Sequence, residues 1–241
     1  MTYVDGFVVA VPTDKRDAYR EHAEAALPMF KGYGATRMVE GWGDDVPRGE
    51  VNDLYGAVEA KDDETVLFSW IEYPDKAARD AAAAQIMAAP EMHALAATMP
   101  FDGRRMIYGG FDVVVDTGTA SDTGYVDGFL MPAGDREAYV AMATRAEAVF
   151  RDHGATRVVE GWASDVSPGK VTGFPQALRL QDGETVVFSW IEWPSKAVRD
   201  AGMARVMDDE RMQMTPEAMP FDGKRMVYGG FVPLFRSDAP A

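Results

Sequence analysis

The spacing of apolar positions changes character within the first third of the chain. Residues 3–11 are rich in β-branched and aromatic side chains and stop at Pro12, which predicts a β-strand. The next apolar side chains recur at steps of four, three and four residues, which predicts one face of an α-helix. These side chains are Tyr19, Ala23, Ala26 and Phe30. Gly32 or Gly34 is expected to end this helix.

The pattern that follows predicts more strands and a second helix. Strands are predicted at residues 36–42, 65–73 and 105–111, with a short irregular strand at 51–60. Asp75 is expected to cap a helix that carries its alanines on one face. The order strand, helix, strand, optional strand, strand, helix, strand is that of a ferredoxin-like βαββαβ unit.

The whole pattern occurs twice. Residues 3–7 (Tyr-Val-Asp-Gly-Phe) recur 122 positions later at 125–129, and residues 34–37 (Gly-Ala-Thr-Arg) recur 120 positions later at 154–157. The second copy has therefore lost two residues near the end of its first strand. A period near 120 residues has the size of a domain and is too long for a solenoid repeat. We expect a tandem duplication.

Domain boundaries follow from the repeat. The first ferredoxin-like repeat is expected at 1–115, a linker rich in Thr, Ser, Asp and Gly at 116–124, the second repeat at 125–235 and a disordered tail at 236–241. The two helices of one such unit cover only one face of its sheet, and an exposed apolar sheet face is unfavourable in water. The predicted fold class is therefore α+β, with the two units packed as an intramolecular pseudo-dimeric α+β barrel. A further homodimer of the whole chain stays possible.

Composition narrows the classes of partner. The 241 residues carry a formal net charge of −15, and no run of Lys and Arg suggests a basic patch, so neither nucleic acid nor an anionic membrane surface is an expected partner. No apolar run is long enough to span a bilayer, and the start of the chain lacks the pattern of a secretory signal. The absence of cysteine excludes disulfides and thiol chemistry. We expect a cytoplasmic protein.

Carboxylates and aromatic rings alternate with aliphatic residues along the predicted strands. The plainly aliphatic set, Val4, Val8, Val39, Leu67 and Ile71, is expected to face the helices. The opposite set is then expected to line the barrel interior, and it holds three carboxylates in each copy: Asp5, Glu40 and Glu72, and Asp127, Glu160 and Glu192. Burial raises the pKa of a carboxyl group, which suits acid–base catalysis near neutral pH. Glu40, Glu160, Asp5 and Asp127 are the candidate catalytic residues.

Other side chains are candidates for contact with a ligand. They are Trp42, Trp162, Phe68, Phe188, Trp70, Trp190, Glu72, Glu192, Arg105 and Arg225. Each has a structural alternative. The rings can be core, Asp5 can hold a turn or pair with an arginine, and Glu72 can be solvated at its strand end. No histidine is shared between the copies and no pair has ligand spacing, so neither a metal nor another cofactor is expected.

Several long motifs resemble one known family. Residues 3–7, 39–46 (Val-Glu-Gly-Trp-Gly-Asp-Asp-Val), 68–74 (Phe-Ser-Trp-Ile-Glu-Tyr-Pro) and 99–106 (Met-Pro-Phe-Asp-Gly-Arg-Arg-Met) are similar to the bacterial family called domain of unknown function 1428, or YbaA-like. The resemblance implies the dimeric α+β barrel superfamily, whose members include monooxygenases of antibiotic biosynthesis, haem-degrading enzymes and lactone isomerases. It implies no particular activity for this chain.

Three functions fit these observations. The first is a small cofactor-independent enzyme that acts on a small planar molecule through carboxylate acid–base chemistry in the barrel interior. The second is a module that binds or senses a small molecule without changing it. The third is a structural or interaction protein whose barrel interior is a packed core.

Overall fold

Both halves of the chain fold into the same succession of elements. The fold is described from a computed structural model, which describes residues 1–120, 122–215 and 218–238. The first half contains β1 (Tyr3–Pro12), η1 (Thr13–Lys15), α1 (Arg16–Gly32), β2 (Arg37–Asp45), α2 (Leu54–Ala57), β3 (Glu64–Tyr73), α3 (Lys76–Ala88), α4 (Pro90–Ala97) and β4 (Ile107–Gly118). The second half contains β5 (Tyr125–Ala133), α5 (Arg136–Asp152), β6 (Arg157–Asp165), α6 (Phe174–Ala177), β7 (Thr185–Trp193), α7 (Lys196–Asp208), η2 (Glu210–Met212) and β8 (Val227–Arg236).

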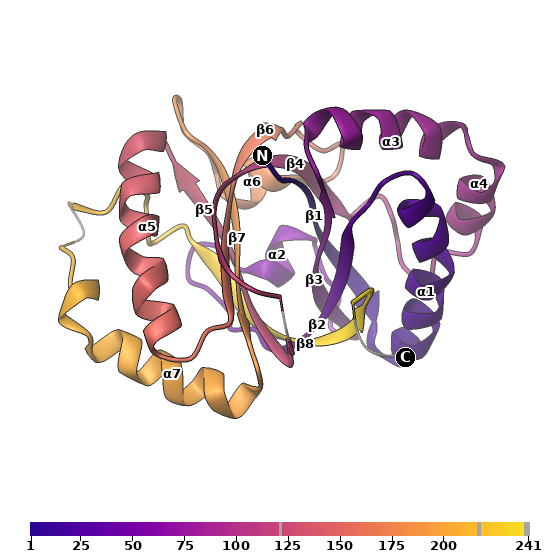
Figure 1. Cartoon of the computed structure of the whole chain (residues 1–241). Helices are drawn as coiled ribbons and strands as arrows, with labels where there is room; N and C mark the ends of the chain where they lie inside the picture. The colour runs from indigo at the N-terminus through magenta and orange to yellow at the C-terminus, as the bar shows by residue number, and fades with distance from the viewer. Residues whose placement is uncertain (121, 216–217, 239–241) are drawn as a thin grey trace.

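The strands form one closed antiparallel barrel. Within each half they are ordered β4-β1-β3-β2 and β8-β5-β7-β6. Pairing of β2 with β8 and of β4 with β6 joins the two sheets along both edges. Figure 1 shows the strands in the middle, with α1, α3 and α4 on one side and α5 and α7 on the other. The predicted α+β class, an intramolecular pseudo-dimeric barrel of two ferredoxin-like units, is confirmed.

Some local predictions were wrong. Residues 51–60 contain the short helix α2 rather than a strand, because the Asp53 side chain caps it by accepting a hydrogen bond from the Gly56 backbone N–H at 2.7 Å. Its residue Leu54 is buried in the barrel core. The helix α4, which begins with Pro90 at its first turn, was not predicted.

The ends of the repeats also differ from the predicted boundaries. β4 continues to Gly118, so the first three residues of the predicted linker pair with β6. Arg236 ends β8, and the backbone N–H of Ser237 donates to Met38 O at 3.0 Å. Asp238 accepts a hydrogen bond from Arg37 Nε at 3.0 Å. The predicted tail at 236–241 is therefore ordered by contacts with β2 as far as Asp238, and residues 239–241 lie outside the described residues.

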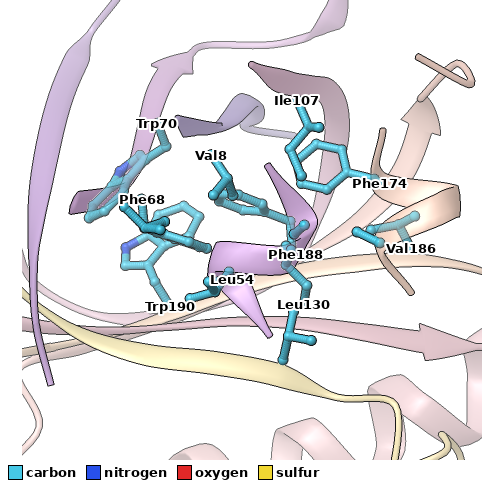
Figure 2. Packing of buried hydrophobic residues seen from close by; sticks show 14 of the residues in the cluster. Val8, Leu54, Phe68, Trp70, Ile107, Leu130, Phe174, Val186, Phe188 and Trp190 are labelled. Atoms are coloured by element: carbon cyan, nitrogen blue, oxygen red, sulfur yellow. The ribbon is translucent and has the colours of Figure 1, made fainter. Parts of the chain in front are cut away.

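The barrel interior is a packed aromatic core shared by the two halves. The rings of Phe68 and Phe188 stack with their centroids 4.3 Å apart, and those of Trp70 and Trp190 stack at 4.5 Å. Figure 2 shows these four rings among aliphatic side chains of both halves. Each stack joins a residue of β3 to its repeat counterpart in β7, so neither half completes this core alone.

Two glycines make room for these rings. A Cβ added to Gly6 lies 2.7 Å from the Phe188 ring, and one added to Gly128 lies 2.7 Å from the Phe68 ring. These glycines are the fourth residues of the repeated Tyr-Val-Asp-Gly-Phe motif. The motif is therefore explained by the approach of the partner half, because no larger residue leaves space for the ring.

Buried ion pairs close one end of the barrel and also connect the halves. Arg37 donates hydrogen bonds to both carboxylate oxygens of Glu192, at 2.6 and 2.8 Å. Arg157 likewise donates to both oxygens of Glu72, at 2.8 and 3.0 Å. Burial raises the pKa of Glu72, but the hydrogen bond and charge of Arg157 outweigh it and hold that pKa below its usual range. Both glutamates are therefore paired anions of the interior.

We predict that Gly6→Ala lowers the free energy of unfolding by about 1–3 kcal/mol, because the added methyl group forces the Phe188 ring out of its stack. Gly32→Ala is the matched control, since a Cβ at Gly32 meets no atom within 4 Å. Chemical denaturation of both variants measures the difference. Equal stabilities for the two variants would contradict this packing.

Candidate functional site

The strand registers decide which side chains face the barrel interior. Residues directly opposite each other in an antiparallel pair project from the same face of the sheet. Val8 lies opposite Phe68 and Val39 opposite Trp70, so both valines share the interior with these rings. The prediction that Val4, Val8 and Val39 face the helices was therefore wrong.

The same registers place all four predicted catalytic acids outside the barrel. Glu40 lies opposite Ser69, and Asp5 shares this helix-covered face. The prediction that Asp5 and Glu40, with their counterparts Asp127 and Glu160, line the barrel interior was wrong. Both faces of these strands are buried, so alternation alone does not tell the interior face from the helix-covered face.

Glu40 instead faces a cavity outside the barrel. The cavity has a volume of about 150 Å³ and lies between the helix-covered face of the first half and the helices α1 and α4. Its polar lining residues are Tyr19, His22, Glu40 and Ser69. Its apolar lining includes phenylalanines and methionines: Phe7, Phe30, Phe101, Met38, Met92, Met99 and Met106. An apolar cavity of this size accommodates a benzene molecule.

Two hydroxyl groups hold one oxygen of the Glu40 carboxyl group. Tyr19 Oη donates to Glu40 Oε2 at 2.8 Å, and Ser69 Oγ donates to the same oxygen. Among the described residues, none donates to Glu40 Oε1, which leaves this oxygen for a molecule in the cavity. Burial raises the pKa of Glu40 to about 7, although both hydroxyl groups lower it. Glu40 is thus poised to take up or release a proton near neutral pH.

The other polar side chains of the cavity are neutral. Burial, followed by the charge of Glu40, holds the pKa of Tyr19 well above its usual range, so Tyr19 keeps its proton and remains a donor. Burial lowers the pKa of His22, whose ring contacts Phe101 edge-on with centroids 6.4 Å apart. Both residues lie on the α1 face that covers the sheet. Glu40 is therefore the group of the cavity whose charge changes near pH 7.

The second half repeats the hydrogen bonds of Glu40 in altered surroundings. Tyr139 Oη donates to Glu160 Oε2 at 2.7 Å, Ser189 Oγ donates to the same oxygen, and burial raises the pKa of Glu160. In the repeat alignment Met131 replaces Val9 and Met142 replaces His22. Both methionines pack in the cluster that contains Tyr139. The copies therefore share the acid and its two donors but differ in the side chains around them.

Asp5 and Asp127 attach helices to the barrel. Asp5 accepts a hydrogen bond from Arg79 Nε at 2.8 Å, and Arg79 also donates to Asp165 of the other half at 2.6 Å. Asp127 accepts from Arg199 Nε and is buried. Burial raises the pKa of Asp5 to about 6, against the charge of Arg79. Neither aspartate lines the cavity, and their ion pairs support the structural alternative for both.

The candidate ligand-binding residues are also distributed through the structure. Phe68, Phe188, Trp70, Trp190, Glu72 and Glu192 belong to the barrel interior described above. Trp42 and Trp162 lie on the helix-covered face, where Trp162 packs on Tyr139 with centroids 5.9 Å apart. Arg105 pairs with Glu64 at 2.6 Å, and Arg225 pairs with Glu184. Of the predicted site residues, the cavity contains Glu40 alone.

Sequence reasoning missed three residues around Glu40. Tyr19 was assigned to the apolar helix face, and Ser69 was not considered as a site residue. A hydroxyl group kept in both copies at a buried position was the available signal, since Tyr139 and Ser189 match them. His22 was not considered as a site residue, because its counterpart in the second copy is a methionine. No pattern within the first copy alone marks His22 as a site residue.

Fold and site together define an α+β barrel protein with a buried acid in a lateral cavity. The chain belongs to the family described as "Protein of unknown function (DUF1428)", which matches residues 2–103 and again 124–223. The protein named "Uncharacterized protein YbaA" in Escherichia coli (strain K12) is 59% identical over 116 residues, which are 48% of this chain and 99% of that protein. The protein of the same name in Shigella flexneri matches equally. Each of these relatives thus corresponds to about one copy of the repeat.

Solved structures share the barrel at low sequence identity. A "putative monooxygenase" from Fusobacterium nucleatum has a TM-score of 0.58 and 10% identity, with 98% of this chain and 93% of that chain covered. One of the same name from Lactobacillus acidophilus also has a TM-score of 0.58, 10% identity and coverage of 98% and 95%. An "anthrone oxidase-like protein" has a TM-score of 0.54, 11% identity and coverage of 98% and 92%. These likenesses establish the fold.

The described residues contain neither a metal-binding cluster nor a helix that could span a membrane. No group of three or more His, Cys, Asp or Glu side chains in this part of the chain is arranged to hold a metal ion. Within the same residues, no helix has the length and apolar character needed to cross a membrane.

We predict that Glu40→Gln changes the pH dependence of stability. In wild type the unfolded chain releases this proton near pH 4.5 and the folded chain near pH 7, so the Glu40 contribution to the free energy of unfolding falls by about 3 kcal/mol as pH rises through that window. Glu40→Gln lacks this decline, so its free energy of unfolding relative to that of wild type rises by the same amount between pH 4.5 and 7. Denaturation from pH 4 to 8 measures the change.

Glu21→Gln, at an exposed glutamate of α1, is the control and keeps the wild-type profile. Parallel profiles for wild type and Glu40→Gln across this window would show that Glu40 is ionised like a solvent-exposed carboxylate.

Proposed function

We propose that this protein is a small-molecule enzyme whose first half holds a largely apolar substrate in the lateral cavity and uses Glu40 to transfer a proton. The observation that carries the proposal is a buried carboxyl group with a pKa of about 7, facing an apolar cavity of about 150 Å³. A general base is most effective when its pKa lies near the working pH. This proposal places the chemistry in the space beneath α1, whereas the sequence had predicted it in the barrel interior.

The hydrogen bonds of Glu40 favour a directed proton transfer. Tyr19 and Ser69 both donate to Oε2, so they stabilise the ionised carboxylate and fix its orientation. Oε1 then accepts the proton of a substrate C–H or O–H group that lies in the cavity. The surrounding phenylalanine and methionine side chains make the lining largely apolar, which strengthens the electrostatic interactions of the site relative to those in water.

The comparisons give weaker support. Proteins named as a monooxygenase and as an anthrone oxidase-like protein share the fold, but a fold accommodates many unrelated chemistries. We therefore base the reaction class on Glu40 and take no substrate from these names.

A second candidate function is binding or sensing without chemistry. Four methionines line the cavity, Met38, Met92, Met99 and Met106, and flexible methionine side chains adapt to ligands of different shape. This alternative requires the same cavity but no proton transfer. A ligand recovered unchanged after prolonged incubation favours it over the enzyme.

We predict that the protein accelerates the ring opening of 5-nitro-1,2-benzisoxazole, an uncharged planar probe. A base removes the ring C–H proton, the N–O bond breaks, and the products are a nitrile and a coloured phenolate, without any further reactant. The rate should rise with pH with a midpoint near 7, as Glu40 ionises. Glu40→Gln should lower it by about 100-fold or more, the range of a lost general base.

Glu160→Gln is the matched control, because Glu160 has the same two donors in the second half, and it should keep the wild-type rate. A Glu40→Gln variant as active as wild type overturns the enzyme proposal. Binding of the probe to wild type without acceleration assigns the cavity to the binding alternative.

A further inference from the structure

The charges around the cavity restrict what enters it. Among the described residues that line it there is no lysine or arginine, its one carboxyl group is that of Glu40, and burial lowers the pKa of its one histidine, His22. A carboxylate or phosphate in this space would meet a second negative charge in an apolar environment without a cation to pair with. The net charge of −15 adds long-range repulsion of anions. The cavity therefore disfavours anions, and its largely apolar lining favours uncharged molecules over cations because a charged group loses its hydration there.

The hydrogen-bonding groups of the cavity restrict the ligand further. The hydroxyl hydrogens of Tyr19 and Ser69 are both donated to Glu40 Oε2. The open position at Glu40 Oε1 is an acceptor when Glu40 is ionised, and the neutral ring of His22 adds one donor and one acceptor to the lining. A ligand that brings a donor satisfies this oxygen, whereas a purely apolar ligand leaves it buried without a partner. A volume of about 150 Å³ limits the part of a ligand that is enclosed beside Glu40 to about one ring.

The second half shows how the same fold closes this space. Met131 and Met142 stand where Val9 and His22 border the cavity of the first half. The hydroxyl group of Tyr139 lies 3.8 Å from Met131 Sδ, so the longer side chain approaches the tyrosine that holds the buried acid. Beyond α7 the second half has the short η2 where the first half has the lining helix α4.

We propose that the cavity of the first half selects an uncharged one-ring compound that donates a hydroxyl group to Glu40, and that Met131 and Met142 close the corresponding space in the second half. The ligand class is thus that of phenols and cyclic alcohols, bound once per chain. This inference names the substrate class of the proposed function and rests on it.

The test compares four ligands that each contain one benzene ring: phenol, toluene, benzoate and benzylamine. Their binding to the full chain is measured by calorimetry at pH 7.5. Phenol should bind with one site per chain and about tenfold or more tightly than toluene, the gain of a hydrogen bond to an ionised acceptor. Benzoate should not bind. Tighter binding of benzylamine than of phenol, or equal affinities for phenol and toluene, overturns the inference.

Variants locate the site and the hydroxyl contact. Val9→Met combined with His22→Met copies the second half, in which methionines pack at both positions, and should abolish binding of phenol and toluene alike. If the double variant does not fold, Val9→Met alone is the second variant. It should weaken the binding of both phenol and toluene. Glu40→Gln should reduce the preference for phenol over toluene to about threefold or less, while Glu160→Gln should leave it unchanged.

The outcomes separate this inference from the proposed function. Phenol binding that depends on Glu40, without ring opening of the benzisoxazole probe, supports the ligand class and refutes the enzyme. Ring opening that depends on Glu40, with toluene bound as tightly as phenol, supports the enzyme and refutes the ligand class. Binding of two phenol molecules per chain would overturn the proposal that Met131 and Met142 close the corresponding space in the second half.

Discussion

The stacking of aromatic rings across the two halves is the interaction on which the rest of the structure depends. Phe68 meets Phe188 and Trp70 meets Trp190 at the centre of the barrel, where a sheet of one half would otherwise expose its apolar face to water. Covalent fusion supplies each sheet with its partner at high effective concentration. The interior is consequently occupied by side chains, and paired charges close one end of it.

A filled interior moves the chemistry to the other face of the sheet. The space beneath α1 belongs to one half, so each copy can change its lining without disturbing the shared core. The first copy keeps a cavity beside Glu40, and the second places methionines around Glu160. Duplication thus separates two requirements: both copies are needed to build the barrel, whereas the proposed ligand site belongs to one copy alone.

The sequence predicted the architecture far better than the site. The exact recurrence of long motifs revealed the duplication, and the order of elements then predicted the barrel. The strand at β3 was assigned its faces correctly, since Phe68 and Trp70 do point inward, whereas β1 and β2 were assigned the reverse. Their two faces are both buried, so the missing information was the register with β3. The cavity is lined in part by α4, a helix that no periodic pattern in the sequence predicted. The side chains of Tyr19 and Ser69 could not be distinguished from ordinary core residues by sequence pattern alone.

The most direct test of the central claim is a titration of the Glu40 side-chain carboxyl carbon by nuclear magnetic resonance, with the signal assigned by its absence in Glu40→Gln. A carboxyl group buried beside the cavity should titrate with a midpoint near 7. The midpoint should move when phenol is added, because the ligand contacts the titrating group. A midpoint near the ordinary value of 4.5, unmoved by phenol, would contradict both the burial of this acid and the site built on it.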